Sequence, residues 1–95
     1  MDNELKPILF SVVIPTYNHA NFLKIALQSV IDQDYESWEA IVVDNNSSDN
    51  TKEVIDSFED SRIRVVSINN NGIIAASRNI GIKESNGDWI AFLDS

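Results

Sequence analysis

The amino-acid sequence predicts an α/β fold, with an open, mostly parallel sheet that carries helices on both faces. Two observations indicate this fold. Four short runs of β-branched and aromatic residues follow one another along the chain, and helical periodicities separate them. Such an alternation places parallel strands side by side, joined by right-handed helical crossovers. With 95 residues, the chain is one small domain at most.

The four runs have the length and composition of strands. They lie at residues 10–14, 40–43, 63–68 and 89–93. The first, second and fourth runs are almost continuously apolar. This predicts that these three strands are covered on both faces, as strands of a parallel sheet usually are.

The first interval between the strands predicts an amphipathic helix. Apolar residues from Phe22 to Ile31 recur at the spacing of one helical face. Asn18 or Asn21 can cap the start of this helix, because asparagine side chains accept hydrogen bonds from free helical amides.

The other two intervals predict shorter or weaker helices. The second helix is expected to begin near Asn50, which stands in capping-box register with Glu53. A third, weaker pattern covers residues 73–84 and ends at the turn formed by residues 85–87. Four acidic residues, Asp32, Asp34, Glu36 and Glu39, are interpreted as a solvated stretch, and Trp38 and Trp89 as packing residues.

The composition narrows the classes of function. With 15 acidic and 7 basic residues, the net charge is -8, which argues against nucleic-acid binding because phosphate contacts need clustered Lys and Arg. The absence of cysteine excludes disulfides, thiol catalysis and cysteine zinc sites. No apolar run approaches the roughly 18–20 residues of a transmembrane segment, and the acidic start does not resemble a signal peptide. We therefore expect a cytoplasmic protein.

Polar residues follow every predicted strand. Ligands of open α/β sheets bind outside the carboxyl ends of the strands, so these exits predict a binding site. The exits lie at residues 15–18, 44–49, 69–72 and 94–95. Their aromatic ring, carboxylates and amides suit a nucleobase and a ribose. The GxGxxG and GxxxxGK[ST] fingerprints are absent, which argues against a dinucleotide-binding Rossmann domain and a P-loop enzyme.

Four motifs follow one another over nearly the whole chain: SVVIPTYN at 11–18, VVDNNSSDNT at 42–51, ASRNIG at 76–81 and GDWIAFLDS at 87–95. In this order and spacing they resemble the N-terminal half of a family 2 glycosyltransferase with the GT-A fold. The resemblance implies a Rossmann-like nucleotide-diphospho-sugar transferase half-domain. It divides the chain into an N-terminal extension, residues 1–9, and the N-terminal part of a GT-A domain, residues 10–95, truncated at the family's Asp-x-Asp motif.

The resemblance also implies a nucleotide-diphospho-sugar donor at the strand ends. The implied binding residues are Pro15, Thr16, Tyr17, Asp44, Asn45, Arg78, Asn79 and Asp94. The first three would border the base, the next two would contact base or ribose, and the arginine and asparagine would approach the nucleotide from the third helix. Asp94 would open the Asp-x-Asp motif, which positions ribose and a divalent cation, Mg²⁺ or Mn²⁺. Hard oxygen ligands suit these ions.

The family pattern has two departures here. Asn45 stands where many members carry a second aspartate, which leaves the choice of nucleotide open. The chain stops at Ser95, one residue before the second aspartate of Asp-x-Asp, which is the usual metal ligand. The general base is then expected beyond Ser95, and no catalytic residue is expected within the chain.

These expectations extend to the longer parent protein. The parent would transfer a sugar, with inversion and metal assistance, to a saccharide or lipid-linked acceptor in polysaccharide biosynthesis, peripheral to the inner face of a membrane. The isolated chain would bind the nucleotide at most, and it would self-associate through its truncated sheet edge.

Two alternatives remain open. The chain could be a non-catalytic binding module that keeps the fold, or an unrelated doubly wound domain such as a receiver-like signalling module. The strand order distinguishes the second alternative, because 3-2-1-4 fits nucleotide binding and 2-1-3-4 favours the unrelated domain. Local roles are also open: Asp44 could cap a turn, and Arg78 could pair with Asp88 or Glu84.

Overall fold

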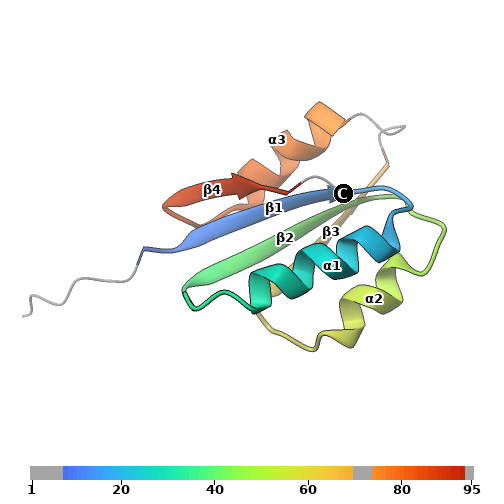
Figure 1. The fold of residues 1–95 in the computed structure, drawn as a ribbon. Helices are drawn as coiled ribbons and strands as arrows, with labels where there is room; N and C mark the ends of the chain where they lie inside the picture. The colour runs from blue at the N-terminus through green and yellow to red at the C-terminus, as the bar shows by residue number, and fades with distance from the viewer. Residues whose placement is uncertain (1–7, 70–73, 94–95) are drawn as a thin grey trace, which may run out of the picture.

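Strands and helices alternate along the chain as the sequence predicts (Figure 1). The structure is a computed structural model that describes residues 8–69 and 74–93. The strands are β1 (Phe10–Thr16), β2 (Trp38–Asn45), β3 (Ile63–Ile68) and β4 (Trp89–Phe92), and the helices are α1 (Ala20–Ile31), α2 (Thr51–Ser57) and α3 (Ile74–Glu84). Every strand pairing between these elements is parallel, which confirms the predicted α/β class.

The strand order is β3-β2-β1-β4. The chain therefore moves outward from β1 to β3 and then returns to the other side of β1 for β4. This reversal makes a switch point beside β1, where open α/β sheets bind their ligands. The order is the one expected for nucleotide binding, and it argues against the receiver-like alternative.

Helices cover both faces of the sheet (Figure 1). Helices α1 and α2 lie on one face, and α3 lies on the other. Because successive side chains of a strand point to opposite faces, the central strands supply two separate clusters of buried residues. Val12, Ile14 and Val42 pack with Leu23 and Leu27 of α1. Val13, Ile41 and Val43 form the second cluster, against which Ile80 of α3 packs.

Helix α3 lies unusually close to the sheet at Gly81. A Cβ atom built at this position would stand 2.2 Å from Cγ1 of Val13. The glycine that weakens the helical pattern in the sequence is therefore the residue that allows α3 to approach β1.

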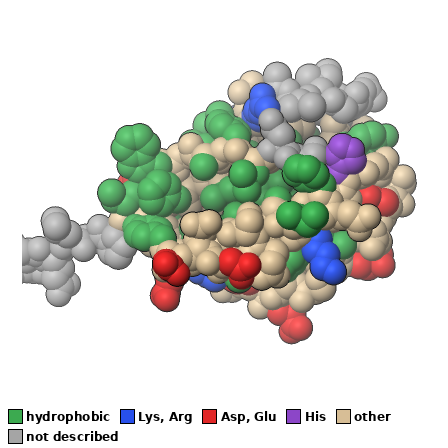
Figure 2. Space-filling view, viewed as in Figure 1, with side chains coloured by type: hydrophobic (Ala, Val, Ile, Leu, Met, Phe, Trp, Pro, Cys, Tyr) green, Lys and Arg blue, Asp and Glu red, His purple; other side chains and the backbone are tan. Residues whose placement is uncertain are grey.

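Strand β4 differs from its predicted burial. All four of its residues are exposed, and Trp89 keeps 62% of its surface accessible. The continuous apolar run led us to expect coverage on both faces, and that expectation is wrong for β4. The physical reason is that the helices pack mainly against β1 and β2, so that β4, at the edge of the sheet, lies largely beyond their cover. Hydrophobic side chains also reach the surface on the face that carries α1 (Figure 2).

Glu39 was expected to be solvated, and the structure corrects this. Its side chain is only 13% exposed. It accepts hydrogen bonds from Ser11 Oγ at 2.5 Å and from the backbone N–H of Asn86 at 2.6 Å, and Arg64 Nη2 lies 3.5 Å away. Burial alone would raise the pKa of Glu39, but the bonds from Ser11 and Asn86 and the charge of Arg64 lower it overall. This carboxylate therefore ties the segment before β4 to the central strands.

The cap predicted for α1 is wrong, whereas Asn50 does occupy the N-cap position of α2 but without the predicted capping bond. The N-cap residues of α1 and α2 are His19 and Asn50, and neither makes a side-chain capping bond. The carboxylate of Asp49 instead accepts from the backbone N–H of Ala20 at 3.1 Å and of Thr51 at 3.1 Å. The two helices start next to each other, so one side chain from the loop between β2 and α2 reaches both.

Candidate functional site

The carboxyl ends of β1 and β2 form the centre of the candidate site. Pro15 and Thr16 are the last residues of β1, and Thr16 lies opposite Asp44 in the register with β2. Thr16 is only 3% exposed, and its hydroxyl Oγ1 has no hydrogen-bond partner among the described residues. Tyr17 follows directly and is 53% exposed. The ring of Tyr17 is therefore the accessible side chain at the end of β1.

Asp44 and Asn45 occupy different environments. Asp44 is half-buried, and its Oδ1 accepts from the backbone N–H of Ser47 at 3.1 Å. This is the turn interaction that the sequence left open, and it holds the carboxylate at the end of β2. Asn45 is 4% exposed, so its amide is buried within the end of the sheet. Of this pair, Asp44 is the residue with access to a ligand.

The residues predicted on α3 approach from the other face of the sheet. Arg78 is half-buried, and its guanidinium carbon lies 5.8 Å from the ring centre of Phe92, the last residue of β4. Asn79 is exposed. Glu84, one of the partners considered for Arg78, lies 3.7 Å from Arg64 Nη1. Asp94 falls outside the described residues.

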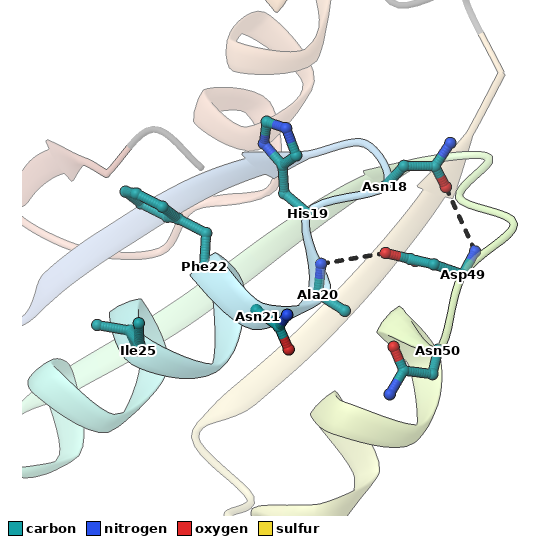
Figure 3. Close-up of a pocket in the computed structure, with 8 residues that line it drawn as sticks. All are labelled: Asn18, His19, Ala20, Asn21, Phe22, Ile25, Asp49 and Asn50. Atoms are coloured by element: carbon teal, nitrogen blue, oxygen red, sulfur yellow. Dashed lines mark hydrogen bonds between the residues drawn. The ribbon is translucent and has the colours of Figure 1, made fainter.

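Sequence reasoning missed the contacts between the two strand-exit loops. An open groove of about 580 Å³ adjoins the site at this point (Figure 3). It is lined by Asn18, His19, Ala20, Asn21, Phe22, Ile25, Asp49 and Asn50. Asn18 follows Tyr17 in the chain, so the groove borders the predicted site without containing Tyr17 or Asp44. The polar run at 44–50 signalled a structured loop, but nothing local indicated which loop it would contact.

Asp49 is the most strongly hydrogen-bonded carboxylate of this region. Its Oδ1 accepts from the hydroxyl of Thr51, a residue with no exposed surface, as well as from the Thr51 backbone. The bond from the Thr51 hydroxyl, followed by those from the Ala20 and Thr51 amides, outweighs desolvation and lowers the pKa of Asp49. Asp49 is therefore ionised at neutral pH and acts as a structural acceptor.

The described residues do not complete a metal site. Among residues 8–69 and 74–93, no group of three or more His, Asp or Glu side chains could hold an ion. The described part of the chain also has no helix long and apolar enough to cross a membrane.

Parallel strands, the reversal beside β1 and a polar rim at the strand ends define an open α/β domain of the Rossmann-like type. Comparison with known families is more specific: the model of glycosyl transferase family 2 matches residues 11–95. The chain belongs to this family, as its four motifs suggested.

Relatives from several bacteria agree. The chain is 38% identical over 92 residues to a protein of Bacillus subtilis named putative teichuronic acid biosynthesis glycosyltransferase TuaG, and covers 36% of it. It is 39% identical over 87 residues to the Escherichia coli protein WfgD, named a UDP-Glc:alpha-D-GlcNAc-diphosphoundecaprenol beta-1,3-glucosyltransferase, and covers 34% of that. These alignments take in 95% and 92% of the chain. The chain thus spans about a third of the length of these relatives.

Solved structures share the fold. The structure of S. aureus TarS residues 1–349 in complex with UDP matches with a TM-score of 0.85 and 30% identity, over 93% of this chain and 27% of that one. A mannosyltransferase from Pyrobaculum calidifontis, solved with GDP-Man and Mn²⁺, matches with a TM-score of 0.79 and 25% identity, over 90% of this chain and 26% of that one. The GT-A fold expected from the sequence is confirmed.

Proposed function

We propose that this chain forms the donor-nucleotide site of a glycosyltransferase. The observation that carries the proposal is the rim of β1 and β2, where the half-buried carboxylate of Asp44, paired in register with Thr16, lies at the same end of the sheet as the exposed ring of Tyr17. A carboxylate suits the edge of a base or the hydroxyls of a ribose, and an aromatic ring offers a stacking face. The neighbours solved with UDP and with GDP-Man support this assignment.

The complete reaction would belong to a longer protein. We propose transfer of a sugar, with inversion, from a nucleotide diphosphate to a saccharide or lipid-linked acceptor, as in polysaccharide biosynthesis. The name of the WfgD relative, which includes a diphosphoundecaprenol acceptor, supports a lipid-linked acceptor and a protein that works at the inner face of a membrane. The general base would come from residues beyond Ser95. The isolated chain is expected to have no transferase activity.

A divalent cation is part of the proposal. A chain with net charge -8 would repel an anionic diphosphate unless a cation lies between them. Mg²⁺ or Mn²⁺ fits this role, because both accept carboxylate and phosphate oxygens. Asp94 is the proposed ligand from this chain, and the Mn²⁺ of the mannosyltransferase structure supports the choice of ion.

Calorimetric titration of the chain with UDP, GDP and dTDP tests the nucleotide site. With saturating Mg²⁺, at least one nucleotide should give measurable heat and shift the amide resonances near Tyr17 and Asp44. Asp44→Ala should weaken that binding by about tenfold or more, the loss of one hydrogen bond to a charged group. Asp34→Ala removes an exposed carboxylate of equal charge and should leave binding within about twofold. Absence of heat and shifts with all three nucleotides would refute the proposal.

Self-association of the isolated chain also stays a prediction. Strand β4 has an exposed apolar side-chain row, and a groove lined by Phe10, Tyr35, Trp38 and Leu93, among others, runs beside it. Light scattering at rising concentration measures the effect. A constant monomer mass would contradict it.

A further inference from the structure

We propose that Asn18 and Asp49 are positioning residues of the nucleotide site. They fasten the loop between β1 and α1 to the loop between β2 and α2, so that Tyr17 and Asp44 are held at one spacing before a nucleotide arrives. This inference rests on the proposed function and adds to it a device that sets the geometry of the site. We call this set of contacts the loop clasp; it consists of Asn18, Ser47, Ser48 and Asp49.

Asn18 bonds to three successive residues of the opposite loop. Its side-chain oxygen Oδ1 accepts from the backbone N–H of Ser48 at 2.7 Å and of Asp49 at 3.3 Å, the latter drawn in Figure 3. Its own backbone N–H donates to Ser47 Oγ at 3.0 Å. Asn18 adopts a φ of 53°, in the left-handed region that asparagine tolerates better than most residues. This conformation accompanies the turn of the chain away from β1 and toward the second loop.

Asp49 closes the clasp from the other side. While its backbone N–H donates to Asn18, its carboxylate accepts from the backbone N–H of Ala20, two residues beyond Asn18 (Figure 3). The two loops therefore exchange hydrogen bonds in both directions. Asp49 is also bonded to Thr51, so the clasp is anchored at the start of α2.

Ser47 connects the clasp to the predicted ligand-binding residues. Its backbone N–H donates to Asp44 Oδ1 at 3.1 Å, and its hydroxyl oxygen accepts from the N–H of Asn18 at 3.0 Å. Asn18 in turn follows Tyr17 in the chain. The path from the carboxylate of Asp44 to Tyr17 therefore runs through two hydrogen bonds and two residues, Ser47 and Asn18. A displacement of Asn18 would alter the relative placement of Asp44 and Tyr17.

Such a connection matters for binding because loop ordering opposes association. Two loops that are free to separate must be ordered when a ligand bridges them, whereas loops already joined lose less freedom. The clasp should therefore contribute to nucleotide affinity even though neither Asn18 nor Asp49 needs to touch the nucleotide.

The test compares two asparagine-to-glycine variants. Asn18→Gly keeps the left-handed backbone accessible and removes the bonds to Ser48 and Asp49. Asn46→Gly is the matched control, because Asn46 has a φ of 58°, is exposed and lies in the second loop, and no side-chain hydrogen bond involves it in the described part of the chain. Both variants give the unfolded chain the same added freedom.

The measured quantity is the dissociation constant, in the presence of Mg²⁺, of whichever of UDP, GDP and dTDP the wild-type chain binds best. All variants are compared at a temperature at which circular dichroism shows each of them to be folded. Asn18→Gly should raise it about five- to tenfold, and Asn46→Gly should change it by less than about twofold. Ser47→Ala, which removes the bond from the Asn18 N–H to the Ser47 hydroxyl and preserves the backbone, should give an intermediate increase. Ser61→Ala is its control, because Ser61 is exposed and its side chain makes no hydrogen bond in the described part of the chain.

The outcomes separate the two proposals. If the wild-type chain binds none of the three nucleotides, the proposed function fails and this inference fails with it. If the wild-type chain binds and the variants Asn18→Gly and Ser47→Ala bind as well as their controls, the nucleotide site stands and the positioning role is refuted. Should Asn18→Gly fail to fold, the comparison of Ser47→Ala with Ser61→Ala decides.

Discussion

Replacing Asp49 tests the idea that one carboxylate stabilises the starts of two helices. Asp49→Ala removes the acceptor for the first helical amide of α1, at Ala20, and for that of α2, at Thr51. It also removes the acceptor of the Thr51 hydroxyl, which has no exposed surface. The negative charge of Asp49 lies at the positive ends of both helix dipoles, so its loss also destabilises the folded chain.

The expected magnitude follows from these contacts. Loss of an N-cap side chain costs about 1 kcal/mol per helix, and a buried hydroxyl left without its partner costs about 1–3 kcal/mol more. Asp49 itself is exposed, so water replaces part of what is lost. We therefore expect the free energy of unfolding to fall by about 2–3 kcal/mol, which for a domain of this size lowers the melting temperature by roughly 10–20 °C.

Urea denaturation followed by circular dichroism measures the effect. Asp49→Asn is informative because an amide has one acceptor oxygen, which can accept from Ala20 or from Thr51 but not from both. Its free energy of unfolding should therefore fall by about half as much as that of Asp49→Ala. Asp34→Ala is the control, since it removes an equal charge from an exposed side chain with no hydrogen bond or ion pair in the described residues. If Asp49→Ala and Asp34→Ala have the same free energy of unfolding, the double-cap interpretation is wrong.

The pH dependence provides a separate check. The pKa of Asp49 is lowered in the folded chain from its ordinary value of 3.8. A lowered folded-state pKa means that its stabilising contribution is complete above the unfolded value and disappears as the pH falls through the folded value. The wild-type chain should therefore lose stability more steeply below about pH 4 than Asp49→Asn does. Parallel stability curves for the two chains would contradict this.

Three further predictions concern the packing and the far end of the sheet. Leu27→Ala truncates a side chain with no exposed surface and should lower the free energy of unfolding by about 2–5 kcal/mol in urea denaturation. Gly81→Ala should lower the free energy of unfolding by about 1–3 kcal/mol, because the new methyl group meets Val13 and this clash outweighs the higher helix propensity of alanine. An unchanged urea midpoint would refute the close approach of α3 to β1. Glu39→Gln should lower the free energy of unfolding by about 1–2 kcal/mol at pH 7 and by less at pH 3, because the pKa of Glu39 is lowered and its contribution to stability begins to fall below the ordinary value of 4.5. A loss of equal size at both pH values would contradict the ionic role of Glu39.

The sequence was sufficient to predict the fold because each element carries its own local signal. The range of β3 was predicted to the residue, and α3 begins within one residue of its expected start. β1 and β2 each continue two residues past the predicted apolar run, through 15–16 and 44–45, because parallel pairing persists there. That pairing depends on the neighbouring strand and leaves no trace in local composition.

The site was only partly predictable for the same reason. The strand-exit rule located Thr16, Tyr17 and Asp44, since it depends on strand order alone. The loop clasp joins residues about 30 positions apart, and Glu39 meets Asn86 across a separation of 47 positions. Polar side chains in both places looked like ordinary loop or surface residues, because what distinguishes them is a partner that only the folded chain provides.

The central place of β1 in the sheet has a consequence for synthesis on the ribosome. During synthesis one edge of β1 pairs with β2, but the other edge has no partner until β4 has been made. The hydrogen bond from the Leu9 N–H to Asp88, which joins the segments before these two strands, spans 79 positions. At the usual rate of about 5–20 residues per second, that edge stays without its partner for roughly 4–16 seconds. An apolar strand with a bare edge can pair with other chains during this interval. The time between the emergence of the first strand and the fourth is therefore when this sheet is most exposed to misassembly.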